Sequence, residues 1–517
     1  SAPAGADSLF EVIATIMLEI FRATVHNNIY LGSQPGDALQ CAGLFSNDKG
    51  RTSRNKSTRR NTIMFHEFDA IIEEMRLVYK HDQRPWMLGY SGGKDSTLLC
   101  QLVFEMLLTL APEERTKKVY VVTSDTMVEN PIVKEYMYRM NHAINKASQA
   151  MGLNVEAHML HPEIRQTFWS LVIGLGYPTP EAPGFRWCTE RLKISPSNKF
   201  TYDTIKKDGE IVILLGVRKA ESAARSRSIS SREIEGKLLS PHVSIPKAYV
   251  YNPLTEIENS VVWKYLLKDH AQSAWGTDNR YLFNLYQGEP LGEEQSVVGE
   301  IDKDKIPITG NSRFGCWCCT MVKEDKSLQN FIEHGATELI PLRRFRNWLV
   351  ELRATPEARD WRRRNGSVYF NSEGEFGRGP FTLETRKTIL KRLLQLEDET
   401  GYELITMDEL KMIDKLWEDE GDLSRRALVD TYYEVRHVRL PWDPFKHAKY
   451  DEATVQSIQA LCQKYNVPFE LVSKLLISVD NTKFYTRSAV STREVEKIMN
   501  QNWLHYENIL EGLKNDN

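Results

Sequence analysis

The chain has 517 residues, of which 41% are hydrophobic and 26% are charged, and its formal net charge is −3. These values are typical of a globular protein with two or three domains, and they exclude a disordered or collagen-like chain. No apolar run approaches the roughly 18 residues of a membrane span, so we expect no membrane association. Seven cysteines, an odd number in a long chain, do not indicate a disulfide framework, and a reducing cytoplasm fits them best.

The first part of the chain is expected to hold a helix and a basic linker. Apolar residues recur at helical spacing over residues 9–30. Residues 46–62 are polar and carry six Lys or Arg against one Asp, which indicates either a solvated linker or a contact with a phosphate backbone. A further helix is predicted over residues 65–79, and it leads into the main domain.

The central motif is a glycine-rich turn between an apolar strand, residues 85–90, and an apolar helix, residues 95–110. Two glycines let backbone N–H groups approach a phosphate, and the helix N-terminus and a lysine add positive charge. This is not a Walker A loop, which needs a glycine five residues before Gly93 and Ser or Thr after the lysine. A chance Gly-Gly turn before a helix is the alternative. The turn consists of Ser91, Gly92, Gly93, Lys94, Asp95 and Ser96.

Strands and helices alternate after this turn. Strands are predicted at residues 119–123, 155–160 and 211–215, and a long helix at 131–151 begins with Asn130 as its cap. This alternation predicts a doubly wound, mostly parallel α/β sheet that binds ligands at the carboxyl ends of its strands. Polar residues stand at these predicted ends: Ser91, Ser124, Asp125 and Arg218.

Several separated segments resemble known families. The turn resembles the SGGxDS pyrophosphate loop of the N-type ATP pyrophosphatases. Residues 216–225 resemble the G-x-R-x-x-E-S-x-x-R segment of phosphoadenylyl-sulfate (PAPS) reductases, and residues 252–266 resemble the segment that closes the PAPS reductase domain. Residues 185–198 and 310–319 are closely similar to DndC. The DndC family provides the ATP pyrophosphatase and sulfurtransferase component of bacterial DNA phosphorothioation.

The resemblance implies a fold and a domain organisation. The fold would be an α/β fold of the adenine-nucleotide alpha-hydrolase, or PP-loop ATPase, type, with added helical regions at both ends. The PAPS reductase-like domain would cover residues 64–330, with its cysteine-rich loop. It would follow an N-terminal helix and basic linker at 1–63 and precede a mostly helical, partly basic region at 331–517.

The resemblance also implies an activity. The chain would be an enzyme that cleaves ATP to AMP and pyrophosphate, with Mg²⁺, and so activates a DNA backbone phosphate for phosphorothioate modification. Its partners would be DNA, a cysteine desulfurase as sulfur donor, and other proteins of a phage-defence modification system. One alternative is a PAPS or adenylyl-sulfate reductase, although a redox cysteine expected near the end is absent from residues 502–517. Another is a non-catalytic scaffold that binds nucleotide and DNA.

Further roles follow from the same resemblance. The turn would hold pyrophosphate, with Lys94 and Asp95 taking part in catalysis and Asp95 or Asp125 placing Mg²⁺. Ser124 and Asp125 would meet the ribose or adenine, and a capping or turn role for Asp125 is the alternative. The segment that begins at Gly216 would add two catalytic arginines.

These arginines, Arg218 and Arg225, are seven residues apart, so both can line one helix face and bind phosphate bidentately. A surface salt-bridge cluster with Glu221 explains the same residues.

Four cysteines are candidate metal ligands: Cys188, Cys316, Cys318 and Cys319. Their C-x-x-C spacing suits Zn²⁺ or an iron–sulfur cluster. The DndC resemblance favours a [4Fe–4S] cluster, but two cysteines of the family pattern are missing, one of them replaced by Thr309. Three interpretations stay open: a three-cysteine cluster with one open iron, a structural zinc, or no metal with Cys188 as a persulfide carrier. Cys318 is a possible fourth ligand.

An arginine-rich stretch lies at residues 342–364, which are predicted to be helical apart from a break at 355–356. It holds eight Arg against three acidic residues, together with three aromatic residues. A basic face with aromatic residues can bind a nucleic-acid backbone and stack on bases. A helix with an apolar face and a solvated arginine face is the alternative. Residues 387–510 are predicted to be mostly helical.

Overall fold

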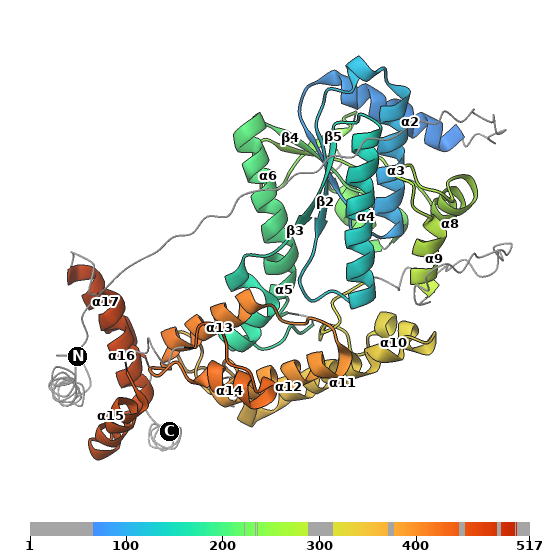
Figure 1. Ribbon diagram of the computed structural model, residues 1–517. Helices are drawn as coiled ribbons and strands as arrows, with labels where there is room; N and C mark the ends of the chain where they lie inside the picture. The colour runs from blue at the N-terminus through green and yellow to red at the C-terminus, as the bar shows by residue number, and fades with distance from the viewer. Residues whose placement is uncertain are drawn as a thin grey trace, which may run out of the picture. The chain divides into compact units, whose positions relative to one another are not determined.

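The structure is a computed structural model of the chain (Figure 1). It describes residues 66–182, 184–221, 223–232, 234, 236–287, 314–370, 377–443, 450–482, 488–501 and 503. The helix expected at residues 9–30 and the basic stretch at 46–62 lie outside the described residues. The described residues belong to two compact units, one within 65–447 and one within 448–503. Residue 330, where a domain boundary was expected, lies inside the first unit.

The first unit contains a six-stranded sheet in the order β3-β2-β1-β4-β6-β5. Every neighbouring pair is parallel except β5–β6 at the edge. The strands are β1 (Trp86–Gly89), β2 (Val119–Ser124), β3 (Val155–Leu160), β4 (Ile211–Leu214), β5 (Leu239–Pro241) and β6 (Ala248–Tyr251). The predicted mostly parallel α/β sheet is therefore confirmed, and the four strands predicted from the sequence are β1 to β4. The two short strands β5 and β6 were not predicted.

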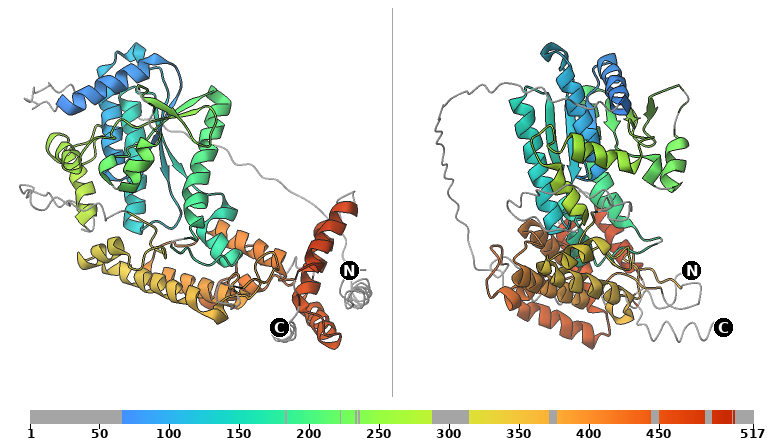
Figure 2. Two further views of the ribbon diagram at one scale, coloured as in Figure 1. Left: turned by 180° about the vertical axis from the view of Figure 1, so that it is seen from behind. Right: turned by 90° about the vertical axis from the view of Figure 1, so that its right-hand side faces the viewer.

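The central strands are apolar because both faces of the sheet are covered, as is usual in parallel sheets. On one face, Trp86 and Leu88 of β1 belong to the main core with α2 (His66–His81), α3 (Lys94–Thr109) and α4 (Pro131–Ala150). On the other face, Met87 packs in a smaller cluster with Phe200 of α6 (Ser195–Asp208). Figures 1 and 2 show α6 alone on its side of β2 and β3, with α3 and α4 opposite.

The start of α4 follows the sequence prediction. Asn130 accepts a hydrogen bond from the Ile132 N–H at 3.0 Å, and Pro131 occupies the first turn. Four shorter helices complete this part of the unit: α5 (Trp187–Thr189), α7 (Ala223–Ser230), α8 (Asn259–Lys264) and α9 (Asn279–Gln287).

A group of helices beyond the sheet shares its core. These helices are α10 (Lys326–Glu333), α11 (Ile340–Ala354), α12 (Leu383–Thr400), α13 (Met407–Glu420) and α14 (Ala427–Arg436). Two buried tryptophans join them to the segment after β3. The indole of Trp169 donates to the Leu404 carbonyl at 2.8 Å, and that of Trp417 donates to the Ile173 carbonyl at 2.8 Å.

The break expected at residues 355–356 is confirmed, because α11 ends at Ala354, but the helix expected to continue to residue 364 is not formed. Pro356 begins a 3-10 turn, and the described residues from 359 to 370 are not helical. A residue that precedes proline avoids the helical conformation, and Thr355 is indeed extended, with φ −72° and ψ 118°.

The second unit consists of helices in its described residues, which agrees with the helical prediction for this region. They are α15 (Glu452–Lys464), α16 (Phe469–Thr482) and α17 (Ser488–Met499). Across the parts of both units that the structure describes, no helix combines the length and the apolar character that a membrane crossing requires.

Candidate functional site

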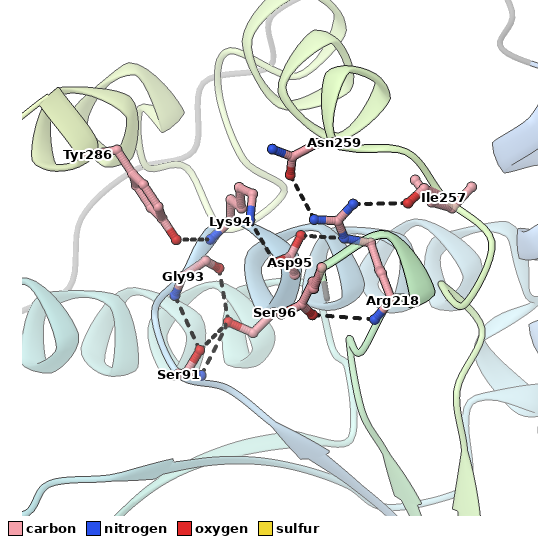
Figure 3. A network of polar contacts seen from close by, with 10 residues as sticks. Ser91, Gly93, Lys94, Asp95, Ser96, Arg218, Ile257, Asn259 and Tyr286 are labelled. Carbon is pink, nitrogen blue, oxygen red and sulfur yellow. Dashed lines mark hydrogen bonds and ion pairs between the residues drawn. The ribbon is translucent and has the colours of Figure 1, made fainter. Parts of the chain in front are cut away.

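The glycine-rich turn joins β1 to α3 at the carboxyl edge of the sheet (Figure 3). Gly92 has φ +72°, and a Cβ there would lie 3.3 Å from the Tyr136 ring, so the turn requires glycine at this position. The Ser96 hydroxyl donates to the Gly93 carbonyl at 2.9 Å and lies 3.2 Å from the Ser91 hydroxyl. The turn is therefore held in shape by its own side chains.

Two charged residues of the turn meet a third one from the chain after β4. Lys94 Nζ lies 2.8 Å from Asp95 Oδ2, and Arg218 Nε lies 2.7 Å from Asp95 Oδ1. Arg218 is 1% exposed, and it also donates to the Ile257 carbonyl at 2.9 Å and to Asn259 Oδ1 at 2.7 Å. Lys94, Asp95 and Arg218 thus lie together in the structure, with two cations sharing one carboxylate.

A tyrosine that the sequence analysis missed completes this cluster. The Tyr286 hydroxyl of α9 accepts a hydrogen bond from the Lys94 N–H at 3.2 Å, and Lys94 Nζ lies 5.9 Å from the centre of the Tyr286 ring. Burial raises the pKa of Tyr286 to about 12, so its hydroxyl is neutral. The Lys94 N–H belongs to the first turn of α3, where a phosphate would bind. Tyr286 is thus bonded to one of the donors that the turn offers to an anion.

Gly216 has a packing role in the same cluster. A Cβ on Gly216 would lie 2.8 Å from the Asp95 carbonyl oxygen, so glycine lets the chain after β4 pass close to the start of α3. Arg218 follows two residues later and precedes a 3-10 turn, Lys219–Glu221. Arg225 lies in α7, and its side chain is outside the described part of the structure.

Asp125 stabilises a turn after β2, which is one of the two roles that the sequence analysis gave for it. It is 1% exposed, and it accepts hydrogen bonds from the Met127 N–H at 2.7 Å and from the Tyr138 hydroxyl at 2.9 Å. Burial raises the pKa of Asp125, but hydrogen bonds from His161, the Met127 amide and Tyr138 outweigh it, so the pKa lies below its ordinary value. Met127 adopts a left-handed φ of 65° in this turn.

Ser124 faces a large cavity of about 1140 Å³ on the α6 side of the sheet. Its hydroxyl lies 3.4 Å from that of Ser197 on α6. The floor of the cavity is the apolar sheet face of Met87, Val122 and Ile213. Charged and polar side chains also belong to its lining: Ser91, Glu129, Glu190, Lys193, Asn198, Arg232, Ser240, His242, Ser244 and Asn252.

A lysine and a glutamate form an ion pair in the wall of this cavity. Lys193 Nζ lies 3.3 Å from Glu129 Oε1, which also accepts a hydrogen bond from Thr126 Oγ1 at 2.9 Å. Glu129 raises the pKa of Lys193 above its ordinary value, burial opposes this, and the thiols of Cys316 and Cys188 reinforce it. Lys193 therefore keeps its positive charge next to the predicted cysteines.

Three of these cysteines come together. Cys188 lies in α5, and Cys316 and Cys319 share a turn in which the Cys319 N–H donates to the Cys316 carbonyl at 3.0 Å. Burial raises the pKa of Cys188 and of Cys316, and the charge of Cys319 raises both further. Cys318 is fully buried in the main core, away from solvent. Burial and the charges of Cys316, Cys319 and Cys188 raise the pKa of Cys318, so this core cysteine lies near the other three.

The expected metal sites do not fit the residues as placed. Within the described residues, no group of three or more His, Cys, Asp or Glu side chains is arranged to hold a metal ion. Both oxygens of Asp95 bind cations of the chain, and Asp125 is bonded within its own turn. No step is therefore assigned to iron, zinc or magnesium.

The arginine-rich stretch is bonded mostly to the chain itself. Arg346 is 2% exposed and donates to the carbonyl oxygens of Cys319 at 2.8 Å and Lys323 at 2.9 Å, and also to that of Val322. Three other guanidinium groups donate to carbonyl oxygens: Arg353 to Pro180 at 2.6 Å, Arg359 to Gly379 at 2.5 Å and Arg364 to Leu175 at 2.6 Å. Arg343 and Arg344 are exposed on α11.

Comparisons with known proteins give distant likenesses. No family model matches the chain. An uncharacterized protein of Methanocaldococcus jannaschii, MJ0066, is 28% identical over 196 residues, which are 37% of this chain and 33% of that protein. The chain thus matches about a third of the length of this relative.

Among solved structures, the PAPS reductase of Candida auris, in a phosphate complex, has a TM-score of 0.26 at 14% identity, over 46% of this chain and 98% of its own. The FMN adenylyltransferase of Candida glabrata has TM-scores of 0.24 with FMN and an ATP analogue and 0.26 with FAD and pyrophosphate. Both are 12% identical, over 46% of this chain and 63% and 67% of theirs. Scores this low carry no functional argument, and the fold assignment comes from the sheet and helices described above.

Proposed function

We propose that this chain is an ATP pyrophosphatase and sulfurtransferase that activates a backbone phosphate of DNA for phosphorothioate formation, as in the DndC family that its motifs resemble. The observation that carries the proposal is the composition of one cavity. Its wall includes Ser91 of the glycine-rich turn, which also holds Lys94, and it includes Lys193, which interacts with the thiols of Cys316 and Cys188. The glycine-rich turn thus borders the cavity, and the candidate sulfur-bearing cysteines lie near a second residue of its wall.

ATP would bind with its β- and γ-phosphates on the turn. The N–H groups at the start of α3 and the nearby cations Lys94 and Arg218 suit phosphate oxygens. Phosphate would replace the Tyr286 hydroxyl as the acceptor for the Lys94 N–H. The apolar floor of Met87, Val122 and Ile213 offers a flat surface for the adenine base.

The first chemical step would place a phosphate of DNA on AMP. An oxygen of the DNA phosphodiester attacks the α-phosphorus of ATP, the bond to the β-phosphate oxygen breaks, and pyrophosphate leaves. The cations around the turn stabilise the charge that develops on pyrophosphate. Asp95 keeps these cations in place, because each of its two oxygens binds one of them.

The second step would exchange AMP for sulfur. A persulfide on Cys188, loaded by a cysteine desulfurase, attacks the activated DNA phosphorus through its terminal sulfur, and AMP leaves. A neighbouring thiol, that of Cys319, then attacks the Cys188 sulfur, which releases the phosphorothioate and leaves a disulfide for an external thiol to reduce. The positive charge of Lys193 favours an anionic sulfur at this position.

Mass spectrometry of nucleosides from cells that carry the complete modification system tests this function. Wild-type chain should give phosphorothioate-linked dinucleotides, and Lys94→Ala and Cys188→Ser should each abolish them. Cys462→Ala, in the second unit, is the matched cysteine control and should leave them unchanged. Undiminished phosphorothioate with Lys94→Ala would contradict the proposal, and sulfite release from PAPS by the purified chain would replace it with a reductase.

A further inference from the structure

We propose that the far end of the large cavity, formed by Arg232, Ser240, His242 and Ser244, binds a phosphodiester group of the DNA strand that accepts the AMP. This inference rests on the proposed function, because it names the place of the second substrate in that reaction. We call these four residues the acceptor end.

The cavity is large enough for two reactants. Its volume of about 1140 Å³ exceeds the roughly 300–1,000 Å³ of sites that enclose one small ligand. A nucleotide held at the turn, near Ser91 and Asn252, would therefore leave part of the cavity open to a second molecule.

The strand register separates the acceptor end from the turn. Leu239 of β5 pairs with Tyr251 at the carboxyl end of β6, where the turn also lies, and Pro241 pairs with Tyr249. The chain of β5 thus runs back along the sheet, away from the turn. His242 lies three residues beyond Leu239, which is about 10 Å at 3.3 Å per residue.

His242 is fixed as a neutral hydrogen-bond donor. Its backbone N–H donates to the Ala248 carbonyl at 2.9 Å. Its ring Nδ1 accepts hydrogen bonds from the backbone N–H groups of Ser244 at 3.2 Å and Ile245 at 3.1 Å. The ring proton therefore resides on Nε2, for which the described residues supply no partner. Burial, together with the charge of Arg232, lowers the pKa of His242 and keeps the ring neutral.

The other groups of the acceptor end also suit an anion. Arg232 brings a planar guanidinium group, which matches a phosphate with two parallel hydrogen bonds. Ser240 and Ser244 add hydroxyl groups. The carboxylates in the described lining, Glu129 and Glu190, belong to the segments after β2 and before α6, and none belongs to the acceptor end.

The acceptor end is open to the outside, which a polymer substrate requires. Val243 is 79% exposed, and Pro241 and Ser244 are exposed as well. The floor of the cavity is buried by contrast, since Met87 and Ile213 are each 5% exposed. A strand can therefore place one phosphodiester in the acceptor end while its neighbouring nucleotides stay in solvent.

Fluorescence anisotropy of a labelled single-stranded DNA 12-mer with the full-length chain and saturating α,β-methylene ATP tests the inference. Arg232→Gln and His242→Phe should each weaken DNA binding about tenfold, because each removes donors to one phosphate. Lys207→Gln removes one exposed charge of α6 outside the cavity lining and should change the affinity less than about twofold. The affinity for α,β-methylene ATP should be unchanged in all three variants.

A 12-mer with uncharged methylphosphonate linkages gives an internal comparison for any folded variant. Wild type and Arg232→Gln should bind it equally, because the contact with the charged phosphate is missing in both cases. The inference would be overturned if wild type and Arg232→Gln bound normal DNA equally. It would also be overturned if Arg232→Gln bound the uncharged strand more weakly than wild type, or if it lost binding of α,β-methylene ATP. Failure of the proposed function would look different, since ATP would then give no AMP while DNA binding still depended on Arg232.

Discussion

The glycine-rich turn and the arginine-rich stretch both concentrate charge, but they use it in different ways. At the turn, Lys94 and Arg218 share the Asp95 carboxylate beside an open cavity. In the stretch 343–364, Arg346 and three other arginines donate to backbone carbonyl groups of neighbouring loops. A cation that is paired with a side chain at a cavity can turn to a ligand, whereas one that satisfies buried carbonyl groups holds the fold together. The partner of a charge, more than its density along the sequence, therefore indicates its role.

The largest effect is expected at the turn. Lys94→Ala should lower the rate of ATP cleavage about 1,000-fold, because it removes a charge next to the leaving pyrophosphate. Its free energy of unfolding should fall by no more than about 1 kcal/mol, since Asp95 keeps its second partner, Arg218. Quenched-flow product analysis and urea unfolding measure the two quantities. A rate within tenfold of wild type would contradict this role.

Asp95→Ala provides the contrast within the same cluster. It leaves the guanidinium of Arg218, which is 1% exposed, without its carboxylate, and breaking a buried pair costs about 3–5 kcal/mol. We therefore expect this variant to lose both activity and stability, and Lys94→Ala to lose activity alone.

In the arginine-rich stretch the expected effect is on stability. Arg346→Met should lower the free energy of unfolding by about 3 kcal/mol, because it leaves the carbonyl groups of Cys319 and Lys323 without a donor. Arg343→Met, at an exposed position of the same helix, should change it by less than about 0.5 kcal/mol. Urea unfolding followed by tryptophan fluorescence measures both. Equal stability of the two variants would erase the distinction between the two regions.

A smaller effect concerns Asp125 and pH. Its pKa lies below the ordinary value of 3.8, so its hydrogen bonds stabilise the fold above this pH and are lost as the pH falls through the folded-state pKa. Asp125→Asn should cost about 1–2 kcal/mol at pH 7 and less at pH 3, where wild type has begun to lose the same contribution. Chemical unfolding at the two pH values tests the sign. A cost that grows at pH 3 would refute the assignment.

Tyr286→Phe tests whether the Lys94 N–H at the turn is a donor to phosphate. Removing the hydroxyl frees the Lys94 N–H for a phosphate, so α,β-methylene ATP should bind about two- to tenfold more tightly. Calorimetry measures the affinity. Tyr281→Phe, on the same helix but bonded to Arg139, is the control and should have no effect. Weaker binding by Tyr286→Phe would mean that the hydroxyl itself holds the nucleotide.

Features formed by neighbouring residues could be predicted from the sequence, whereas contacts between residues far apart in the chain could not. The turn at Ser91–Ser96 and the strands β1 to β4 were predicted because motifs and apolar runs are local patterns. The contact between Lys94 and Tyr286 joins residues 192 positions apart, and no periodicity marks it. The ion pair of Lys193 with Glu129 is hidden for the same reason. Strand β5 has only three residues, too few for a clear pattern, and β6 is half-buried at two of its four positions, whereas β4 of the same length is buried throughout.

The arginine-rich stretch was ambiguous in sequence for a physical reason. A guanidinium group suits a phosphate and a set of carbonyl oxygens equally well, and only the fold brings the carbonyl oxygens of Cys319 and Lys323 to Arg346.

DNA binding by the stretch is expected to be the smallest effect. We propose that only its exposed members contact DNA, so Arg343→Gln with Arg344→Gln should lower the slope of log affinity against log salt by about 2 at most. Anisotropy titrations of a DNA duplex at several salt concentrations measure the slope. An unchanged slope would exclude Arg343 and Arg344 from DNA contact.

The central claim is that the turn supports cleavage of ATP between its α- and β-phosphates. The most direct test incubates the full-length chain with Mg²⁺ and ATP, with and without DNA and a cysteine desulfurase, and separates the nucleotide products. With both DNA and the desulfurase present, the account predicts AMP and pyrophosphate in equal amounts, and about 1,000-fold slower formation of both with Lys94→Ala. ADP and inorganic phosphate as the products would contradict it.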